Sequence, residues 1–261
     1  MDHREAGAYW NENAEVWTRL ARQGYDVYRD RLNAPAFMEM LPDVEGLSGI
    51  DLGCGEGYNT RLMARAGAKM TAVDISEVFI RHASEQEASE PLGIDYQVAS
   101  AVETAFADEH FDFTAATMSL MDIPEPQKAL AEAFRIVKPG GFLQFSITHP
   151  CYDTPYRRNL RDESGKTYAL EVGDYFGNLK GEIVEWIFGA TPPEIRKTLP
   201  KFKTPFYTFT LSEWLNMIIG VGFQIEELRE PRPSDETVAQ CPELQDAQVV
   251  AYFLHVRGRR P

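Results

Sequence analysis

Short apolar runs alternate with amphipathic stretches through the first half of the chain. Between residues 47 and 150, five short runs are expected to form strands: 49–52, 70–73, 95–98, 113–117 and 142–148. Helices are predicted at 58–65 and 125–137, where apolar residues recur at helical spacing, and after Ser76, which can cap a helix start. This alternation predicts a parallel sheet with helices on both faces.

The N-terminal segment, residues 1–46, has the pattern of helices. Four of its residues share helical spacing and predict one apolar stripe: Tyr9, Trp10, Ala14 and Trp17. Pro35 suits the first turn of a second helix, because proline has no N–H to lose there. We expect a helical lid over the core, with helices that are simply packed on the core as the alternative.

Residues 151–208 interrupt the alternation directly after the fifth predicted strand. The segment is rich in aromatic and charged residues, and only residues 182–188 alternate in the manner of a strand. Ligands bind beyond the carboxyl ends of parallel strands. An insertion at this place therefore predicts a substrate cap, with a satellite apolar core as the alternative.

The last segment, residues 209–261, returns to regular structure. Residues 210–213 form a capping box that opens a helix reaching about residue 219. A strand at 223–228, a polar loop at 230–245 and a strand at 249–256 are expected to follow. The chain is therefore predicted to be a single α/β domain.

Composition and charge narrow the functional classes. The 261 residues carry a net charge of −14, and 44% of them are hydrophobic, which is ordinary for a folded domain. So acidic a chain is unsuited to nucleic-acid backbones and anionic membranes, which attract clusters of Lys and Arg. The acidity either keeps the protein in solution or attracts cationic substrates.

Neither a disulfide framework nor a metal site is predicted. The three cysteines, Cys54, Cys151 and Cys241, are odd in number and widely spaced, with no metal-type pair. The first residues lack the apolar run of a signal peptide, and no run approaches the roughly 18 residues that span a bilayer. We therefore expect a reducing, cytoplasmic location.

The strongest chemical pattern runs from Ile50 to Gly57, with the sequence Ile-Asp-Leu-Gly-Cys-Gly-Glu-Gly. It predicts a buried strand, a glycine turn and a helix start, where backbone N–H groups can approach a ligand. The carboxylate of Asp51 is expected in the same cleft, where it would repel phosphate and attract a cation. The glycine spacing also differs from that of dinucleotide-binding loops. The loop therefore predicts a small ligand with a positive group.

This motif and three later ones resemble the motifs of the class I S-adenosylmethionine-dependent methyltransferases. The later motifs are Ala-Val-Asp-Ile-Ser at 72–76, Phe-Asp at 111–112 and Lys-Pro-Gly-Gly at 138–141. They follow the family's order and spacing, which is far more specific than one glycine loop. The resemblance implies a Rossmann-like methyltransferase fold, a doubly wound, seven-stranded, mostly parallel sheet. Its seventh strand would run antiparallel between strands five and six.

The resemblance also implies the cofactor S-adenosyl-L-methionine, with S-adenosyl-L-homocysteine as the product. The backbone N–H groups of Gly53, Cys54 and Gly55 are expected to hold the carboxylate of the cofactor's amino acid tail. Asp51 is expected to bind the ammonium of that tail, directly or through water, with a cap of the loop's own N–H groups as the alternative.

The nucleoside would be held after the second strand. Asp74 lies about 20 residues past the loop, where an acidic side chain can accept hydrogen bonds from both ribose hydroxyls. A cap of the following helix is the alternative role for Asp74. Ile75 is expected to pack on the adenine face.

The adenine site departs from the family's pattern. An acidic residue after strand three often binds the exocyclic amine in the family, and Ser100 stands at that position here. We expect modestly weaker cofactor binding unless Glu103 substitutes. The backbones of Ala101 and Val102 are expected to contact the adenine.

The resemblance implies two further parts of the site. After strand four it places the Met118 backbone near the ribose and the methionine moiety. N-terminal helices of the family often close over the cofactor, and Tyr25, Tyr28 and Arg29 are the candidates for that role here.

Methyl transfer requires mainly alignment, because the sulfonium is already activated. A base is needed only if the acceptor must lose a proton. His149, directly after strand five, is the first candidate, with a histidine that orients a loop or the substrate as the alternative. Tyr207 and Tyr28 are weaker candidates.

We therefore predict methyl transfer to a small, partly apolar or aromatic acceptor through an O or N nucleophile. The alternatives are a methyltransferase for a protein or other macromolecule, a nucleotide-binding oxidoreductase, and a non-catalytic S-adenosylmethionine-binding module.

Overall fold

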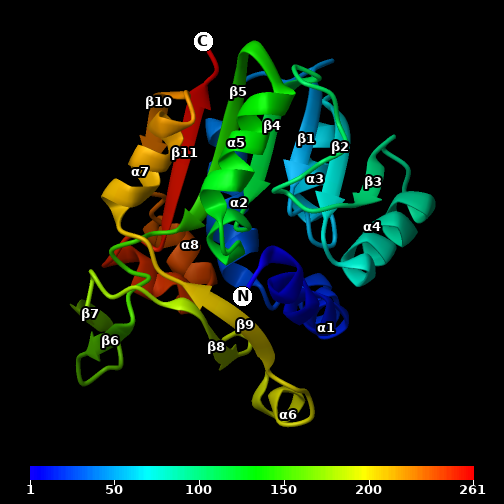
Figure 1. Ribbon diagram of the computed structural model, residues 1–261. Helices are drawn as coiled ribbons and strands as arrows, with labels where there is room; N and C mark the ends of the chain where they lie inside the picture. The colour runs from blue at the N-terminus through cyan, green and yellow to red at the C-terminus, as the bar shows by residue number, and fades with distance from the viewer.

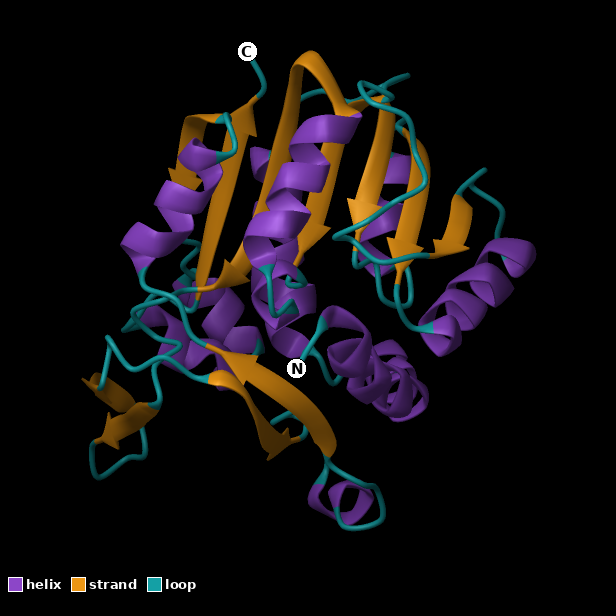
Figure 2. Cartoon of the chain, viewed as in Figure 1, coloured by secondary structure: helices purple, strands orange, loops and turns teal.

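The computed structural model describes residues 1–261 and is centred on a seven-stranded sheet in the order β10-β11-β5-β4-β1-β2-β3. The strands are β1 (Ser48–Leu52), β2 (Lys69–Asp74), β3 (Asp95–Val98), β4 (Phe111–Thr117), β5 (Val137–Thr148), β10 (Gln224–Arg229) and β11 (Phe253–Arg259). β1 to β5 are parallel, and β11 runs antiparallel between β5 and β10. The predicted doubly wound, Rossmann-like methyltransferase fold is confirmed (Figures 1 and 2).

Helices cover both faces of the sheet. In Figure 1, α5 (Pro126–Ile136) and α7 (Leu211–Gly220) lie in front of it, and α2 (Ala34–Met40) and α3 (Tyr58–Arg65) lie behind it. α4 (Glu77–Ser89) packs on β2 and β3. Each face buries its own apolar cluster, because parallel strands covered on both sides must be apolar on both sides.

The two hydroxyl caps predicted at helix starts are confirmed. Ser76 precedes α4, and its hydroxyl accepts the Phe79 N–H at 3.2 Å. Thr210 precedes α7, where its hydroxyl accepts the Glu213 N–H at 3.2 Å and the Glu213 carboxylate accepts the Thr210 N–H at 2.7 Å. Each cap satisfies helix N–H groups that have no partner within the helix.

The segments outside the sheet gather at the carboxyl ends of the parallel strands, below the sheet in Figures 1 and 2. The N-terminal segment forms α1 (His3–Arg22) and a π-helical turn, η1 (Arg29–Asn33), that leads into α2. The insertion forms two antiparallel hairpins and a short helix: β6 (Tyr156–Arg161) with β7 (Thr167–Gly173), β8 (Lys180–Trp186) with β9 (Phe202–Tyr207), and α6 (Pro193–Arg196). The strand expected at 182–188 is thus found as β8.

The predicted boundary between α5 and β5 is wrong. The helix ends at Ile136, and the Lys138–Gly141 motif lies inside β5 as a bulge, where the pairing with β4 shifts register. Gly140 donates its N–H to the Arg260 carbonyl at 2.8 Å, and Gly141 accepts the Arg260 N–H at 2.9 Å. Pairing with the C-terminal strand therefore holds this segment extended.

Two C-terminal predictions are also wrong. The polar loop at 230–245 contains α8 (Asp235–Gln240), capped by Ser234, and part of the 3-10 helix η3 (Pro242–Gln248). The last strand begins at Phe253, not at residue 249, and continues through charged residues to Arg259. It extends that far because arginines of β11 pair with glutamates of β10, as Arg259 does with Glu226 at 2.7 Å.

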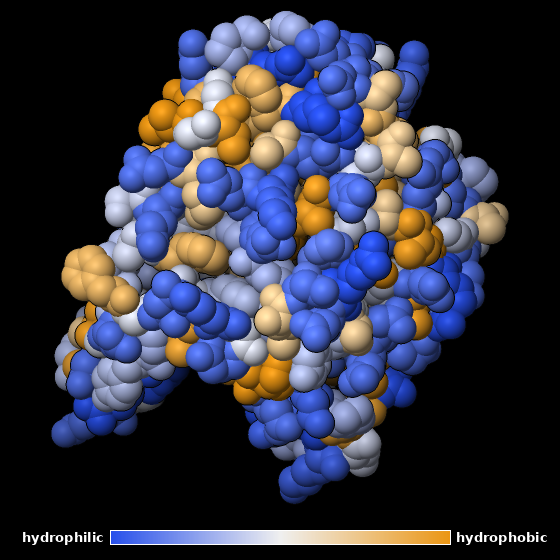
Figure 3. All heavy atoms as spheres, viewed as in Figure 1, coloured by the Kyte–Doolittle hydropathy of each residue, from blue (hydrophilic) through white to orange (hydrophobic).

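The surface in Figure 3 is mostly hydrophilic, and hydrophobic residues form small separate groups on it. This agrees with the net charge of −14. No helix combines the length and hydropathy that crossing a bilayer requires.

Candidate active site

A cavity of about 870 Å³ lies beyond the carboxyl ends of β1, β2, β4 and β5. This volume is near the upper end of the range for small-molecule sites, about 300–1,000 Å³. Its floor consists of residues at or just after these strand ends: Gly53, Cys54, Gly55, Asp74, Ile75, Thr117, Met118 and Thr148. Its walls come from α1, η1, β8, β9 and η3. Segments far apart in the sequence therefore enclose the strand ends.

The turn after β1 requires glycine. Gly53 has a φ of +76°, and a Cβ on it would lie 2.5 Å from the Cβ of Ser119. The Ser119 hydroxyl donates to the Leu52 carbonyl at 2.6 Å. The glycine turn and the 3-10 helix η2 (Leu120–Asp122), which follows Ser119, are thus packed directly together.

The backbone donors of this turn are already engaged within the protein. The Gly53 and Cys54 N–H groups donate to the Val73 carbonyl at 2.8 and 3.0 Å. The Gly55 N–H donates to Oδ2 of Asp74 at 2.8 Å. The expectation that these three groups hold the cofactor's carboxylate is therefore not supported, although the three residues do line the cavity.

Asp74 lies at the cavity wall and is 9% exposed. Its Oδ1 accepts the Ser76 N–H at 2.8 Å, and its Oδ2 accepts the Gly55 N–H. Because a carboxylate has about four acceptor directions, each oxygen can accept one more hydrogen bond. Burial raises the pKa of Asp74 to about 6. The side chain thus holds the backbone at both neighbouring turns and keeps capacity for two hydroxyl donors.

Asp51 does not face the cavity as expected. It is buried below the turn, where the Thr60 hydroxyl donates to its Oδ2 at 2.6 Å and its Oδ1 has no partner. Burial raises the pKa of Asp51 to about 7. The predicted contact with the cofactor's ammonium stays a prediction, and the alternative of a cap on the loop's N–H groups is not seen.

The residues expected at the adenine divide into two groups. Ile75, Ser100 and Ala101 line the cavity, whereas Val102 does not. Glu103 is exposed and lies outside the cavity, so it cannot replace the missing acidic group.

The N-terminal helix lies on Ile75. A Cβ added to Gly7 of α1 would lie 2.8 Å from the Ile75 side chain, so α1 approaches this residue through a glycine. The sequence signal for this contact was present in Gly7, which interrupts a helical pattern without a local reason.

Arg29 of η1 anchors the end of the cavity next to the glycine turn. Its Nη1 lies 3.0 Å from Oε1 of Glu56, its Nε lies 2.9 Å from Oδ1 of Asp30, and its guanidinium lies 3.9 Å from the centroid of the Tyr58 ring. Asp26 adds a third carboxylate, 3.9 Å from Nε of Arg29, and burial raises the pKa of Asp26 to about 6. The cluster joins the lid segment to the turn.

Tyr25 and Tyr28 also line the cavity, as the lid hypothesis expected. The Tyr28 ring stacks on Tyr252 with centroids 4.9 Å apart, and its hydroxyl donates to the Glu243 carbonyl at 2.9 Å. These contacts tie η1 to the C-terminal segment, so Tyr28 has a structural role whatever it does for a ligand.

His149, the first candidate base, does not line the cavity. Its Nε2 lies 2.9 Å from Oε1 of Glu230, and its Nδ1 accepts the Cys151 N–H at 3.1 Å. Both ring nitrogens are thus engaged, which agrees with the alternative of a histidine that orients a loop. Successive residues at a strand end point in opposite directions, and Thr148 faces the cavity in its place.

Tyr207, a weaker candidate base, also lies outside the cavity lining. Its hydroxyl contacts Sδ of Met1 at 3.3 Å, and burial raises its pKa to about 12. A phenol that holds its proton so firmly is a poor base near neutral pH.

Sequence reasoning gave no specific role to the aromatic end of the cavity. Trp17 of α1 contacts three rings edge-on, with centroids at 5.5 Å for Trp10, 5.4 Å for Trp186 and 4.8 Å for Phe188. All four residues line the cavity. The apolar stripe predicted in the first helix contained two of them, but its partners in the insertion are about 170 residues away.

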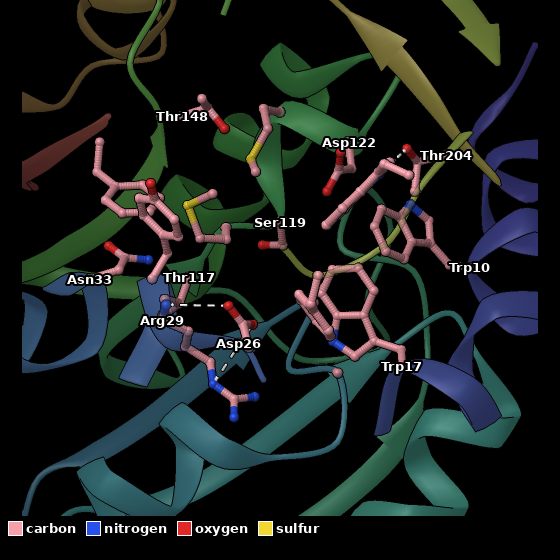
Figure 4. Close-up of a pocket in the computed structure, with 18 of the residues that line it drawn as sticks. Trp10, Trp17, Asp26, Arg29, Asn33, Thr117, Ser119, Asp122, Thr148 and Thr204 are labelled. Carbon is pink, nitrogen blue, oxygen red and sulfur yellow. Dashed lines mark hydrogen bonds and ion pairs between the residues drawn. The ribbon is translucent and has the colours of Figure 1, made fainter. Parts of the chain in front are cut away.

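Sequence reasoning also gave no role to Asp122. This last residue of η2 lines the cavity, is half-buried and makes no side-chain hydrogen bond or ion pair. Burial raises its pKa well above the ordinary value, and the nearby charge of Asp153 raises it further. Figure 4 shows Asp122 on the side of Trp10, Trp17 and Thr204, whereas Arg29 and Asp26 lie on the other side of Ser119.

The chain is similar to known proteins in sequence and in fold. The family model described as "Methyltransferase domain" matches residues 50–145, from β1 into β5. A crystal structure of an S-adenosylmethionine-dependent methyltransferase from Mesorhizobium loti superimposes with a TM-score of 0.69 and 28% identity. The match covers 87% of this chain and 96% of that chain, and so extends well beyond the core.

Two curated relatives are named ubiquinone biosynthesis O-methyltransferase. The protein from Parvibaculum lavamentivorans is 36% identical over 99 residues, which are 38% of this chain and 39% of that protein. The protein from Alkalilimnicola ehrlichii is 32% identical over 146 residues, which are 54% and 55%. The chain thus spans only about half of the length of these relatives.

Proposed function

We propose, since the chain belongs to the class I S-adenosylmethionine-dependent methyltransferases, that it transfers a methyl group from S-adenosylmethionine to a small-molecule acceptor. The observation that supports this most directly is the single cavity with two unlike ends. One end carries the family's glycine turn and Asp74, and the other carries an aromatic wall and Asp122. A cofactor and an acceptor in one cavity meet the geometric demand of in-line transfer.

The residues present fit the cofactor at the first end. Asp74 can accept two hydroxyl donors, and Ile75 and Ala101 offer apolar contacts to a planar base. Below the turn, Oδ1 of Asp51 is a buried acceptor without a partner that does not line the cavity, so a contact with the cofactor's ammonium would need a bridging water. When bound, the cofactor supplies an activated methyl group on a positively charged sulfur.

The protein's own residues would align the acceptor. The walls from α1 and β8 enclose the cavity, so we infer that they exclude water and orient a partly apolar or aromatic molecule. The curated relatives are named as O-methyltransferases, which supports a hydroxyl as the nucleophile.

The concave shape and the volume of about 870 Å³ suit a small acceptor, and the net charge of −14 disfavours nucleic acid. The roles of residues 1–46 as a lid and 151–208 as a cap are part of this proposal. The cytoplasmic location stays a prediction from the sequence.

Two measurements test the proposal. Isothermal titration with S-adenosylmethionine, S-adenosylhomocysteine and NADH should show binding of the first two only, and binding of NADH alone would contradict the cofactor assignment. Turnover is then followed as S-adenosylhomocysteine release with a panel of catechols, hydroxybenzoates, aliphatic alcohols and amines. Binding without release on any panel member would identify a non-catalytic module.

A further inference from the structure

We propose that Asp122 is the general base of this enzyme and that the acceptor presents a hydroxyl to it. The inference rests on the proposed function and names the nucleophile and the proton acceptor of the same site. Asp122 takes the role of general base that the sequence predicted for His149, which does not line the cavity.

The position of Asp122 follows from the packing of η2 on the glycine turn. Ser119 contacts Gly53 and donates to the Leu52 carbonyl at 2.6 Å. Asp122 is three residues further along a 3-10 helix, which rises about 2 Å per residue, so its backbone lies about 6 Å along the wall from that contact. A carboxylate at this distance lies past the turn and toward the aromatic end.

The surroundings of Asp122 leave its carboxylate for a ligand. The side chain has no hydrogen-bond or ion-pair partner. By contrast, Asp74 in the same cavity accepts the Gly55 N–H, and Asp153 accepts a hydrogen bond from the Arg157 guanidinium. In Figure 4 the carboxylate points into the cavity, near Ser119. A half-buried carboxylate without a protein partner is available to a ligand that donates a hydrogen bond.

The nucleophile follows from the same geometry. A hydroxyl held against the aromatic walls of Trp10 and Trp186 can donate its hydrogen bond to Asp122 and turn an oxygen lone pair to the cofactor. As the oxygen–carbon bond forms, the hydroxyl proton passes to the Asp122 carboxylate. The methyl carbon–sulfur bond breaks, its electron pair stays on sulfur, and sulfur becomes a neutral thioether. Asp122 then releases its proton to water when product leaves.

Several charged groups face this part of the cavity and could affect its titration. Those that line the cavity are Asp153 after β5, Arg157 on β6 and His3 on α1; the Tyr207 phenol on β9 and the ion pair of Glu125 with Lys128 beside η2 lie outside the lining. Asp153 disfavours ionisation of Asp122, and Arg157 offsets this by pairing with Asp153 at 2.8 Å. A pH experiment on Asp122 must separate it from His3 and Asp153.

The test compares Asp122→Asn with the wild-type enzyme, using the panel hydroxyl compound that the wild type turns over fastest. Loss of a general base is expected to lower kcat by about 100-fold or more. The dissociation constant of S-adenosylmethionine should change by less than about threefold. At S-adenosylmethionine concentrations that saturate the enzyme at every pH, so that protonation of Asp74 does not limit the rate, the acidic limb of the acceptor kcat/KM profile should disappear in Asp122→Asn, persist in His3→Gln and move to lower pH in Asp153→Asn.

Two further variants separate catalysis from folding. Asp122→Glu should recover part of the lost rate, because it restores a carboxylate. Asp95→Asn, on the exposed start of β3, is the matched control and should retain wild-type rates. Unaltered kcat in Asp122→Asn, or an acidic limb that survives in it, would overturn the assignment of the base.

The outcomes also separate the two proposals. A wild-type enzyme that releases no S-adenosylhomocysteine with any panel member overturns the proposed function and this inference together. Turnover of amines but of no hydroxyl compound overturns the inference alone, because the nucleophile would then be nitrogen.

Discussion

At one end of the cavity Asp74 accepts backbone N–H groups on both of its oxygens, whereas at the other end Asp122 has no partner at all. Asp74 is buried and Asp122 is half-buried, and burial raises the pKa of each. Asp74 therefore belongs to the framework of two neighbouring turns and keeps its orientation without a ligand. The Asp122 carboxylate has no protein partner, which is why we propose that a ligand supplies one.

This difference between Asp74 and Asp122 reflects how the two ends of the cavity are built. The end with the glycine turn and Asp74, which we propose as the cofactor end, is built from strand ends and a turn that requires glycine, so its geometry is fixed by the sheet. The acceptor end is built from α1, η2, β8 and β9, which meet only through tertiary contacts. A site that must accept one constant cofactor can be rigid, whereas the acceptor end can differ between relatives of the same fold.

The largest effect is expected for Asp74→Ala. Each hydrogen bond from a ribose hydroxyl to the charged carboxylate is worth about 1.5–3 kcal/mol, so the loss of two should weaken S-adenosylmethionine binding by at least about 100-fold. Titration calorimetry measures this, with Asp95→Asn on the neighbouring strand as the control. An affinity within twofold of the wild type would show that Asp74 only caps its turns.

The second largest effect is expected from lower pH, which should weaken the binding of S-adenosylmethionine. Protonation of Asp74, with its pKa of about 6, removes acceptor capacity, so affinity for S-adenosylmethionine should fall by about tenfold between pH 7 and pH 5. Titrations across this range measure it. Asp26 and Asp51 have pKa values of about 6 and 7, so Asp74→Asn is needed to isolate the share of Asp74. An unchanged slope in Asp74→Asn would assign the effect to the other carboxylates.

Without the cofactor, the raised pKa of Asp74 should make the folded protein more stable at low pH than at neutral pH. A carboxyl group whose pKa is raised on folding binds protons more tightly in the folded state. Its contribution to stability is present below pH 3.8 and is lost as the pH rises through about 6. The cofactor reverses this preference, so it should stabilise the protein more at pH 7 than at pH 5.

At the acceptor end, Trp186→Ala should act on the acceptor alone. The Trp186 ring contacts Trp17, and its Nε1 donates to the Thr204 hydroxyl at 2.9 Å. Removal of this wall should raise the acceptor KM by about tenfold, about 1.4 kcal/mol, and leave the S-adenosylmethionine affinity unchanged. Steady-state kinetics with Trp186→Phe as the matched variant tests this, and a parallel loss of cofactor affinity would show that the two ends are not independent.

The smallest effect is expected on stability, where substitutions of the two carboxylates should act in opposite directions. Asp122→Asn removes a half-buried carboxylate without a protein partner and should raise the free energy of unfolding by up to about 1 kcal/mol, or the Tm by about 2–4 °C. Asp74→Asn should lower it, because Gly55 and Ser76 lose a charged acceptor. Thermal denaturation of the cofactor-free variants measures both. A loss of stability in Asp122→Asn would mean that the carboxylate has a structural role.

The sequence by itself determined the sheet, the glycine turn after β1 and the place of Asp74. Residues 50–57 predict a strand, a turn and a helix start by local rules, and β1 and α3 are found where these rules place them. Asp74 could be identified in the same way, because its place is set by the strand it ends. Such features depend on neighbours in the chain, which periodicity and glycine spacing can report.

Only the tertiary structure decided which groups face the acceptor. Thr148 and His149 are adjacent and point in opposite directions. Thr148 faces the cavity, whereas His149, which the sequence analysis chose as the candidate base, does not. Trp17 and Trp186 meet although they are far apart in the chain, and Asp122 is exceptional only because no other segment supplies it with a partner. The absence of a contact is a property of all the surrounding segments together, so no local pattern in a single sequence can contain it.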